Sequence, residues 1–271
     1  GAEGILGIDM DPRPIDALQG LVVTAAACGK HHTTVITEEG QIWSWGAFGN
    51  GQLGVGEISK EKFPHGYVDP MRVQALDTQA PRAVACGNYH TVLVDGYGDI
   101  WTCGTGDNHA HGQDTHFDVA TPMILNKVSN LDFRQVACGA AHTIALTANG
   151  LLFSWGLNEH GQLGLGDLVS RKTATQNESV QGKHIRKIAC GEAHSAFLSD
   201  RDVYTFGDGS HGALGHGNSK TQIGPKAVIK LTEDCRLREV ECGPQYTVAL
   251  SDLGQLYFWG NMKSTSGRGS K

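Results

Sequence analysis

A Cys-Gly pair occurs five times along this chain of 271 residues, and a similar stretch of sequence follows each pair. The pairs begin at Cys28, Cys86, Cys138, Cys190 and Cys242, so the spacing is 58 residues once and 52 residues three times. Self-similarity at a period of about 50 residues indicates a repeat architecture. The repeats begin near residues 22, 82, 134, 186 and 238 and account for nearly all of the chain. A single domain over residues 1–271 is therefore predicted.

Each repeat has the pattern of short β-strands. In the third repeat, 134–137 and 143–146 are apolar runs, Asn149-Gly150 is a strong hairpin signal, and Phe153 and Trp155 alternate on one strand face. A Gly-rich turn at 161–164 follows, and most repeats add a fourth strand such as 70–76 or 225–231. Helical periodicity is absent. Four short strands per unit predict an all-β fold, a β-propeller built of four-stranded blades.

The two ends of the chain are in phase with the repeat. The last repeat stops after its third strand, near Trp259, and the N-terminus supplies what it lacks. Residues 4–7 match the Gly-rich turn, and 12–18 match 70–76 at four positions if Ile is counted as Val. Residues 1–20 are therefore predicted to complete the last blade and to close a ring of five blades, which removes an open sheet edge.

Composition limits the environment and the partners. The chain has no apolar run of 18 residues, and residues 1–20 are acidic and proline-containing where a signal peptide is basic and then apolar. Five of its seven cysteines fill one repeat slot, at a spacing that matches no zinc pattern. We expect reduced thiols in a cytoplasmic or nuclear protein with no membrane partner. The net charge of −6 argues against nucleic acid or chromatin as a partner.

The sequence of the repeats resembles that of a known family. Residues 137–143, 153–156 and 160–167 are similar to the regulator of chromosome condensation repeat, and the resemblance covers all five units. It implies a β-propeller with closure between the termini. Propellers of this family usually have seven blades, so either the ring has five blades or two blades lie outside this sequence; the in-phase ends favour five. The resemblance also implies several functions, including guanine-nucleotide exchange on the small GTPase Ran, ubiquitin-ligase modules, ciliary scaffolds and ultraviolet-B reception.

Other signals of chemistry have a structural interpretation. Residues 49–54 fit a dinucleotide fingerprint, but the same turn recurs at 160–164 without the required helix. His32, His90, His142 and His194 share a repeat slot and are predicted to bond backbone groups between strands or blades. His109 and His116 are extra histidines, for which a surface loop is favoured over a metal site. The tryptophans are predicted to be core residues. Catalytic motifs are absent, so we expect no enzyme, cofactor or metal.

Two loops depart from the repeat and are the predicted partner site. Both follow the third strand, in adjacent repeats, so they should lie at one rim of the propeller. Phe63 and Tyr67 are the expected anchors, because aromatic residues dominate protein interfaces. A tolerated insertion is the alternative explanation. The candidate residues are Lys60, Lys62, Phe63, His65, Tyr67, Asp107 and His109.

The predicted function is a monomeric protein-interaction scaffold or regulatory module. The alternative is an exchange factor for a Ran-type small GTPase, which needs no covalent chemistry. No segment matches the wedge that the family's founding member inserts into its GTPase. Residues 1–20 carry four acidic residues and one arginine, unlike that member's basic chromatin-binding tail.

Overall fold

A computed structural model describes residues 12–200, 202–229 and 236–261. These residues form five antiparallel sheets, called blades 1 to 5 in chain order; the first four have four strands and the last has three. Blade 1 contains β1 (Val23–Cys28), β2 (His32–Thr37), β3 (Ile42–Ala47) and β4 (Tyr67–Val73), and blade 2 contains β5 (Ala83–Cys86), β6 (His90–Val94), β7 (Ile100–Gly104) and β8 (Val119–Ile124). Blade 3 contains β9 (Phe133–Cys138), β10 (His142–Thr147), β11 (Leu152–Gly156) and β12 (Arg171–Gln176). Blade 4 contains β13 (Lys187–Cys190), β14 (His194–Leu198), β15 (Val203–Gly207) and β16 (Gln222–Ala227), and blade 5 contains β17 (Leu237–Cys242), β18 (Tyr246–Ser251) and β19 (Leu256–Gly260).

The blade architecture confirms the all-β, four-stranded repeat predicted from the sequence. The predicted hairpin at Asn149-Gly150 joins β10 to β11, and Gly150 adopts the left-handed backbone (φ 84°) that such a turn requires. The fourth strands differ from the prediction, because they begin and end earlier: β4 ends at Val73, and the 3-10 helix η2 (Gln74–Leu76) follows it. Pro70, Pro122 and Pro225 lie inside these strands, each of which is the last strand of its sheet. Proline is tolerated on such an edge and protects it from further pairing.

Short 3-10 turns mark other connections. They are η1 (Asp16–Leu18), η3 (Asp107–His109), η4 (Asn126–Val128) and η5 (Glu178–Val180). No helix in the described part of the chain is long and apolar enough to cross a membrane.

Antiparallel pairing within each blade distributes the connections over two faces. The turn between the first and second strands and the loop between the third and fourth strands emerge together, and we call this side the loop face. The turns between the second and third strands lie on the opposite side, the hairpin face. The two loops predicted to form the partner site, before β4 and before β8, are thus both on the loop face.

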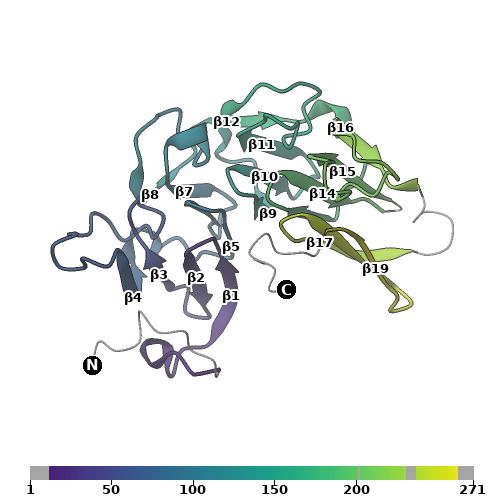
Figure 1. Ribbon diagram of the computed structural model, residues 1–271. Helices are drawn as coiled ribbons and strands as arrows, with labels where there is room; N and C mark the ends of the chain where they lie inside the picture. Colours follow the sequence, from purple (N-terminus) through teal and green to yellow (C-terminus); the bar gives the residue numbers. More distant parts are fainter. Residues whose placement is uncertain (1–11, 201, 230–235, 262–271) are drawn as a thin grey trace, which may run out of the picture.

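Neighbouring blades pack through apolar side chains on their inner strands. Between blades 3 and 4, Ile144 and Leu146 of β10 pack against Ile188 and Phe197, and all four are buried. Every residue of β6, β10 and β14 is buried, which confirms that these strands are covered on both faces. Figure 1 shows the blades following one another along an arc, with blades 1 and 5 at its two ends.

The two ends of the arc are less covered than its middle. Burial alternates along β18, unlike along β10, and Leu256 and Phe258 of β19 are exposed. Trp155 is the one fully buried tryptophan; the other four are half-buried, which corrects the prediction that all are core. Trp43 and Trp45 belong to blade 1, whose outer face has no neighbouring blade among the described residues, whereas Trp259 of blade 5 packs against blade 4.

Closure of the ring stays a prediction. Residues 4–7, which match the Gly-rich turn, lie outside the described residues. Residues 12–15 are exposed and have no strand structure, and η1 follows them as η2 follows β4. Blade 5 has three described strands, so its completion by residues 1–20 stays a prediction as well.

Candidate functional site

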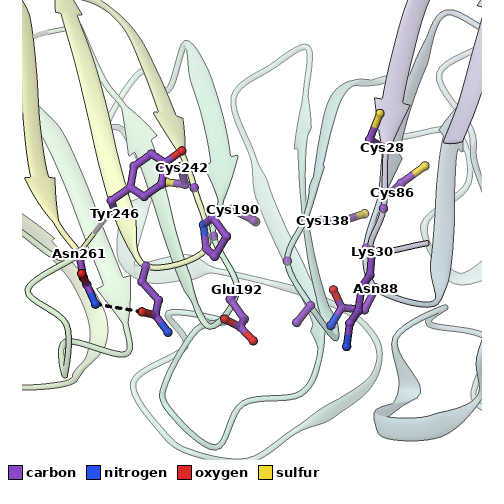
Figure 2. Close-up of a pocket in the computed structure, with 18 residues that line it drawn as sticks. Cys28, Lys30, Cys86, Asn88, Cys138, Cys190, Glu192, Cys242, Tyr246 and Asn261 are labelled. Carbon is purple, nitrogen blue, oxygen red and sulfur yellow. Dashed lines mark hydrogen bonds between the residues drawn. The ribbon is translucent and has the colours of Figure 1, made fainter. Parts of the chain in front are cut away.

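The Cys-Gly turns of all five blades surround one central cavity of about 640 Å³. Figure 2 shows Lys30, Asn88 and Glu192 near one end of this cavity and the cysteines farther in. Backbone hydrogen bonds join the turns from blade to blade: Asn88 N–H donates to Ala140 O (3.1 Å), Ala140 N–H to Glu192 O (3.0 Å), and Glu192 N–H to Pro244 O (3.0 Å). From blade 2 to blade 5 the cavity wall is therefore a continuous hydrogen-bonded backbone structure made from successive repeats.

The repeat histidines bond the next blade, as predicted, but their partners are hydroxyl groups and not backbone groups. His32, His90, His142 and His194 place Nε2 at 2.8–3.0 Å from the hydroxyls of Thr91, Thr143, Ser195 and Thr247, respectively. The hydroxyls of Thr91, Ser195 and Thr247 in turn donate to a backbone carbonyl of the preceding blade's Gly-rich turn. Each of these hydroxyls therefore accepts from the histidine, which fixes the neutral Nε2–H tautomer.

Burial keeps these histidines uncharged. It lowers the pKa of His32 and His194 to about 4 and that of His90 and His142 to about 3. Neighbouring histidines lower the pKa further for His32, His90 and His142. The Nδ1 atoms of His32, His90 and His142 are buried and have no hydrogen-bond partner in the structure. Neutral, enclosed imidazoles that bond between blades serve the fold and not proton transfer.

The cysteines around the cavity are structural. Cys86 Sγ donates to Ala27 O and Cys190 Sγ to Ala137 O, each across a blade interface. Burial raises the pKa of Cys86 and Cys190 to about 12 and that of Cys138 well above its ordinary value. A thiol that stays protonated at neutral pH is a poor nucleophile. All six described cysteines are unpaired, whereas Cys235 lies outside the described residues.

Cys28 is the exception, and its reactivity tests whether the outer face of blade 1 is uncovered. It occupies the same slot as Cys86 but is exposed, because no blade precedes blade 1 among the described residues. In variants that retain a single cysteine, we expect a maleimide to modify Cys28 at least about 100-fold faster than Cys86 at pH 7.5, because Cys86 is covered and its thiolate is scarce. Mass spectrometry of timed samples measures the rates. Protection of Cys28 would show that a further structural element covers blade 1, as ring closure requires.

The predicted partner site divides into two parts. In the loop between β3 and β4, Lys60, Lys62, Phe63 and His65 are exposed, and so is Tyr67, the first residue of β4, as a binding role requires. Phe63 also contacts Phe48 edge to face, with ring centroids 6.4 Å apart, so the loop is held against the blade. The structure thus gives Phe63 both an exposed surface and a fixed position.

The second part of the predicted site lies in η3 of blade 2. Asp107 is exposed, whereas His109 is half-buried and its ring packs on that of His116, with centroids 4.6 Å apart. The η3 segment leans on blade 3, where Trp155 Nε1 donates to Ala110 O (3.0 Å). No group of three or more His, Cys, Asp and Glu side chains within the described ranges could hold a metal ion. His109 and His116 form a pair without the further ligands that a metal site needs.

Sequence reasoning missed three exposed apolar residues on the same face. Phe117 is 82% exposed, Leu168 is 53% exposed and Val169 is 61% exposed. They precede β8 and β12, as Phe63 precedes β4, so the same connection carries them in blades 2 and 3. Aligning the residues just before the fourth strand of each repeat would have found them.

Comparisons with known proteins place the chain in a family. A sequence profile described as "RCC1-like domain" matches residues 1–271. The ultraviolet-B receptor UVR8 of Arabidopsis thaliana is 32% identical over 258 residues, which are 95% of this chain and 57% of the receptor. The probable E3 ubiquitin-protein ligase HERC6 of Homo sapiens is 30% identical over 266 residues, covering 95% of this chain and 25% of the ligase. The chain thus spans little more than half of the receptor and a quarter of the ligase.

Solved structures show the same fold. Human WBSCR16 superposes with a TM-score of 0.79 at 27% identity, over 92% of this chain and 64% of that one. Prp20p of Saccharomyces cerevisiae, whose structure was reported with its binding properties to Gsp1p and histones, superposes with a TM-score of 0.74 at 23% identity, over 89% of this chain and 57% of that one. Together with the five repeats and their four-stranded blades, the profile match over every residue shows that this chain belongs to the family of RCC1-like domains.

Proposed function

We propose that this chain is a protein-interaction module that binds its partner on the loop face. The observation that carries the proposal is the contrast between a repeated framework and one longer loop on that face. The loop before β4 has 19 residues between its flanking strands at Ala47 and Tyr67, whereas the loop before β12 has 14 between Gly156 and Arg171. The loop before β8, which was also predicted to depart from the repeat, has 14 residues and is no longer than the loops before β12 and β16. Loops held by a rigid scaffold are where binding residues concentrate.

Exposed apolar side chains support this choice of face. Phe63 and Tyr67 in blade 1, Phe117 in blade 2, and Leu168 and Val169 in blade 3 all belong to the connection that leads into the fourth strand. Large apolar groups in water cost free energy that binding recovers, at about 25 cal/mol per Å² of buried apolar surface. Because Phe63 rests on Phe48, it loses little conformational freedom on binding, which favours affinity.

Substitution of both aromatic anchors tests the proposal. We expect Phe63→Ala combined with Tyr67→Ala to reduce recovery of the bound partner at least ten-fold. The reason is that an aromatic anchor at the centre of an interface contributes about 2 kcal/mol or more to binding. Quantitative mass spectrometry after affinity capture with the wild type and the variant measures the loss. The matched control is Tyr97→Ala, since Tyr97 is 73% exposed on the hairpin face. Equal recovery with the double variant, or an equal loss with Tyr97→Ala, would contradict the proposal.

Nucleotide exchange on a small GTPase is the alternative function. It rests on the resemblance of the repeats to a family that includes the Ran exchange factor. The proposed docking face would serve either function, because an exchange factor must also bind a protein. Exchange itself is measured separately, by release of nucleotide from the GTPase.

A further inference from the structure

A second cavity, of about 250 Å³, opens beside the central one on the loop face. Turns of three blades form its walls: His160 comes from blade 3, Glu192, Asp208 and His211 from blade 4, and Gln245 from blade 5. Its lining includes two carboxylates and no lysine or arginine. The cavity therefore presents negative charge without a permanent positive charge from the chain itself.

The repeat shows that the fold does not need a carboxylate at position 208. The residue after the third strand's final Gly donates its backbone N–H to the first turn in every blade, and this slot holds Ala47, Thr105, Leu157, Asp208 and Asn261. Blade 4 alone has an acid here. The four other blades form the same backbone bond with neutral residues, so this bond does not require a carboxylate at position 208.

Glu192 departs from its repeat slot in the same way. The residue that follows the Cys-Gly pair is Lys30, Asn88, Ala140, Glu192 or Pro244, so the acid again occurs in blade 4 alone. The backbone of Glu192 joins the hydrogen-bonded series of turns, while its side chain is exposed and lines both cavities. Figure 2 shows Glu192 on a turn near the end of the central cavity. Two independent departures from the repeat thus meet at one cavity.

The contacts of Asp208 hold it ionised and leave it able to accept more hydrogen bonds. Ser210 donates to it twice, from its backbone N–H to Oδ1 (2.9 Å) and from its hydroxyl to Oδ2 (2.8 Å). Burial opposes ionisation, but the bonds from Ser210 and the nearby His160 and His211 outweigh it and keep the pKa of Asp208 below its ordinary value. A carboxylate has about four acceptor sites, so two remain after the bonds from Ser210.

We propose that this cavity binds a cationic side chain, arginine or lysine, of a protein that docks on the loop face. Asp208 is the hydrogen-bonding anion in the wall, and Glu192 adds a second negative charge at the rim. Arginine suits such a site because its planar guanidinium can donate two bonds to one carboxylate. An anionic group would meet two carboxylates and be repelled. The inference rests on the proposed function in one respect, that the cation belongs to a protein partner.

Short peptides test the cavity without the partner. The probes are acetyl-Gly-Arg-Gly-amide and acetyl-Gly-citrulline-Gly-amide, which have nearly the same shape and differ in charge. We expect the arginine peptide to shift the imidazole NMR signals of His160 and His211 saturably, and the citrulline peptide to bind at least ten-fold more weakly. Equal binding of the two peptides, or no saturable shift with the arginine peptide, would overturn the proposal.

Two variants locate the binding. The Asp208→Asn variant should bind the arginine peptide at least ten-fold more weakly. It should still fold, because blade 5 has an asparagine, Asn261, in the same repeat slot. Glu159→Gln is the matched control, since Glu159 is exposed next to His160 but does not line the cavity. Binding unchanged in Asp208→Asn would overturn the proposal. Because peptide binding does not involve Phe63 or Tyr67, a failure here is distinguishable from a failure of the proposed docking face.

Discussion

Acidification from pH 7 to pH 5.5 is expected to lower the free energy of unfolding by about 5 kcal/mol. Four histidines, His32, His90, His142 and His194, are buried and neutral in the folded chain, with pKa values lowered to about 4 or about 3. In the unfolded chain they titrate near 6.5, so below that pH the unfolded state binds more protons and stability falls. Each histidine contributes about 1.3 kcal/mol over this interval. Their stabilising contribution is present in full above pH 6.5 and is lost as the pH falls towards 4.

Urea unfolding at a series of pH values measures this effect. The loss is a large part of the roughly 5–15 kcal/mol by which domains are stable, so acid unfolding should begin well above the range in which carboxylates titrate. His90→Gln keeps an N–H donor but cannot titrate, and should reduce the pH dependence by about a quarter. His65→Gln, at an exposed position, should leave it unchanged. A free energy of unfolding that is flat from pH 7 to 5.5 would show that the imidazoles are not enclosed as described.

Gly139→Ala is expected to destabilise the chain by about 3 kcal/mol. A Cβ at residue 139 would lie 2.0 Å from His142 Cε1 and 2.6 Å from Gly191 O, distances that real Cβ atoms do not show. The His142 ring cannot move away without losing its bond to the hydroxyl of Ser195. The addition would therefore disturb the turn, the histidine and the interface with blade 4 together.

Thermal and urea unfolding of two alanine variants check this expectation. Gly49→Ala is the matched control, because no atom lies within 4 Å of its added Cβ and its backbone is outside the left-handed region. Its stability should change by less than about 0.5 kcal/mol. If both alanines have the same effect, the close contact between the Cys-Gly turn and the histidine is not what requires glycine at position 139.

The sequence predicted the blades well because each repeat contains its own evidence. The apolar runs, the Asn149-Gly150 hairpin and the recurring turns are local signals, and they were found where expected. The hydrogen-bond partner of each repeat histidine was harder to predict from the sequence. The contact joins residues that are 53 or 59 positions apart, as in His142 with Ser195 or His32 with Thr91. A signal was present: a threonine or serine follows each of these histidines, and in blades 2 to 4 its hydroxyl receives the bond from the histidine of the preceding blade.

Exposure was harder to predict than strand position. Trp43 and Trp155 occupy neighbouring slots of one repeat pattern, yet burial depends on whether a blade covers that face. The cavity around Asp208 could not be predicted from one repeat, since three blades form its walls. The unusual acid itself was visible in the alignment of repeats. The apolar positions Phe117, Leu168 and Val169 were visible in the same way, because they lie in two loops of equal length just before the fourth strand.

Release of labelled GDP from Ran-type and related small GTPases distinguishes the proposed scaffold role from nucleotide exchange most directly. An interaction module without exchange activity should leave the rate of release unchanged when added in catalytic amounts to each GTPase. Acceleration by orders of magnitude, with any member of the panel, would contradict a scaffold role and would show that the chain is an exchange factor.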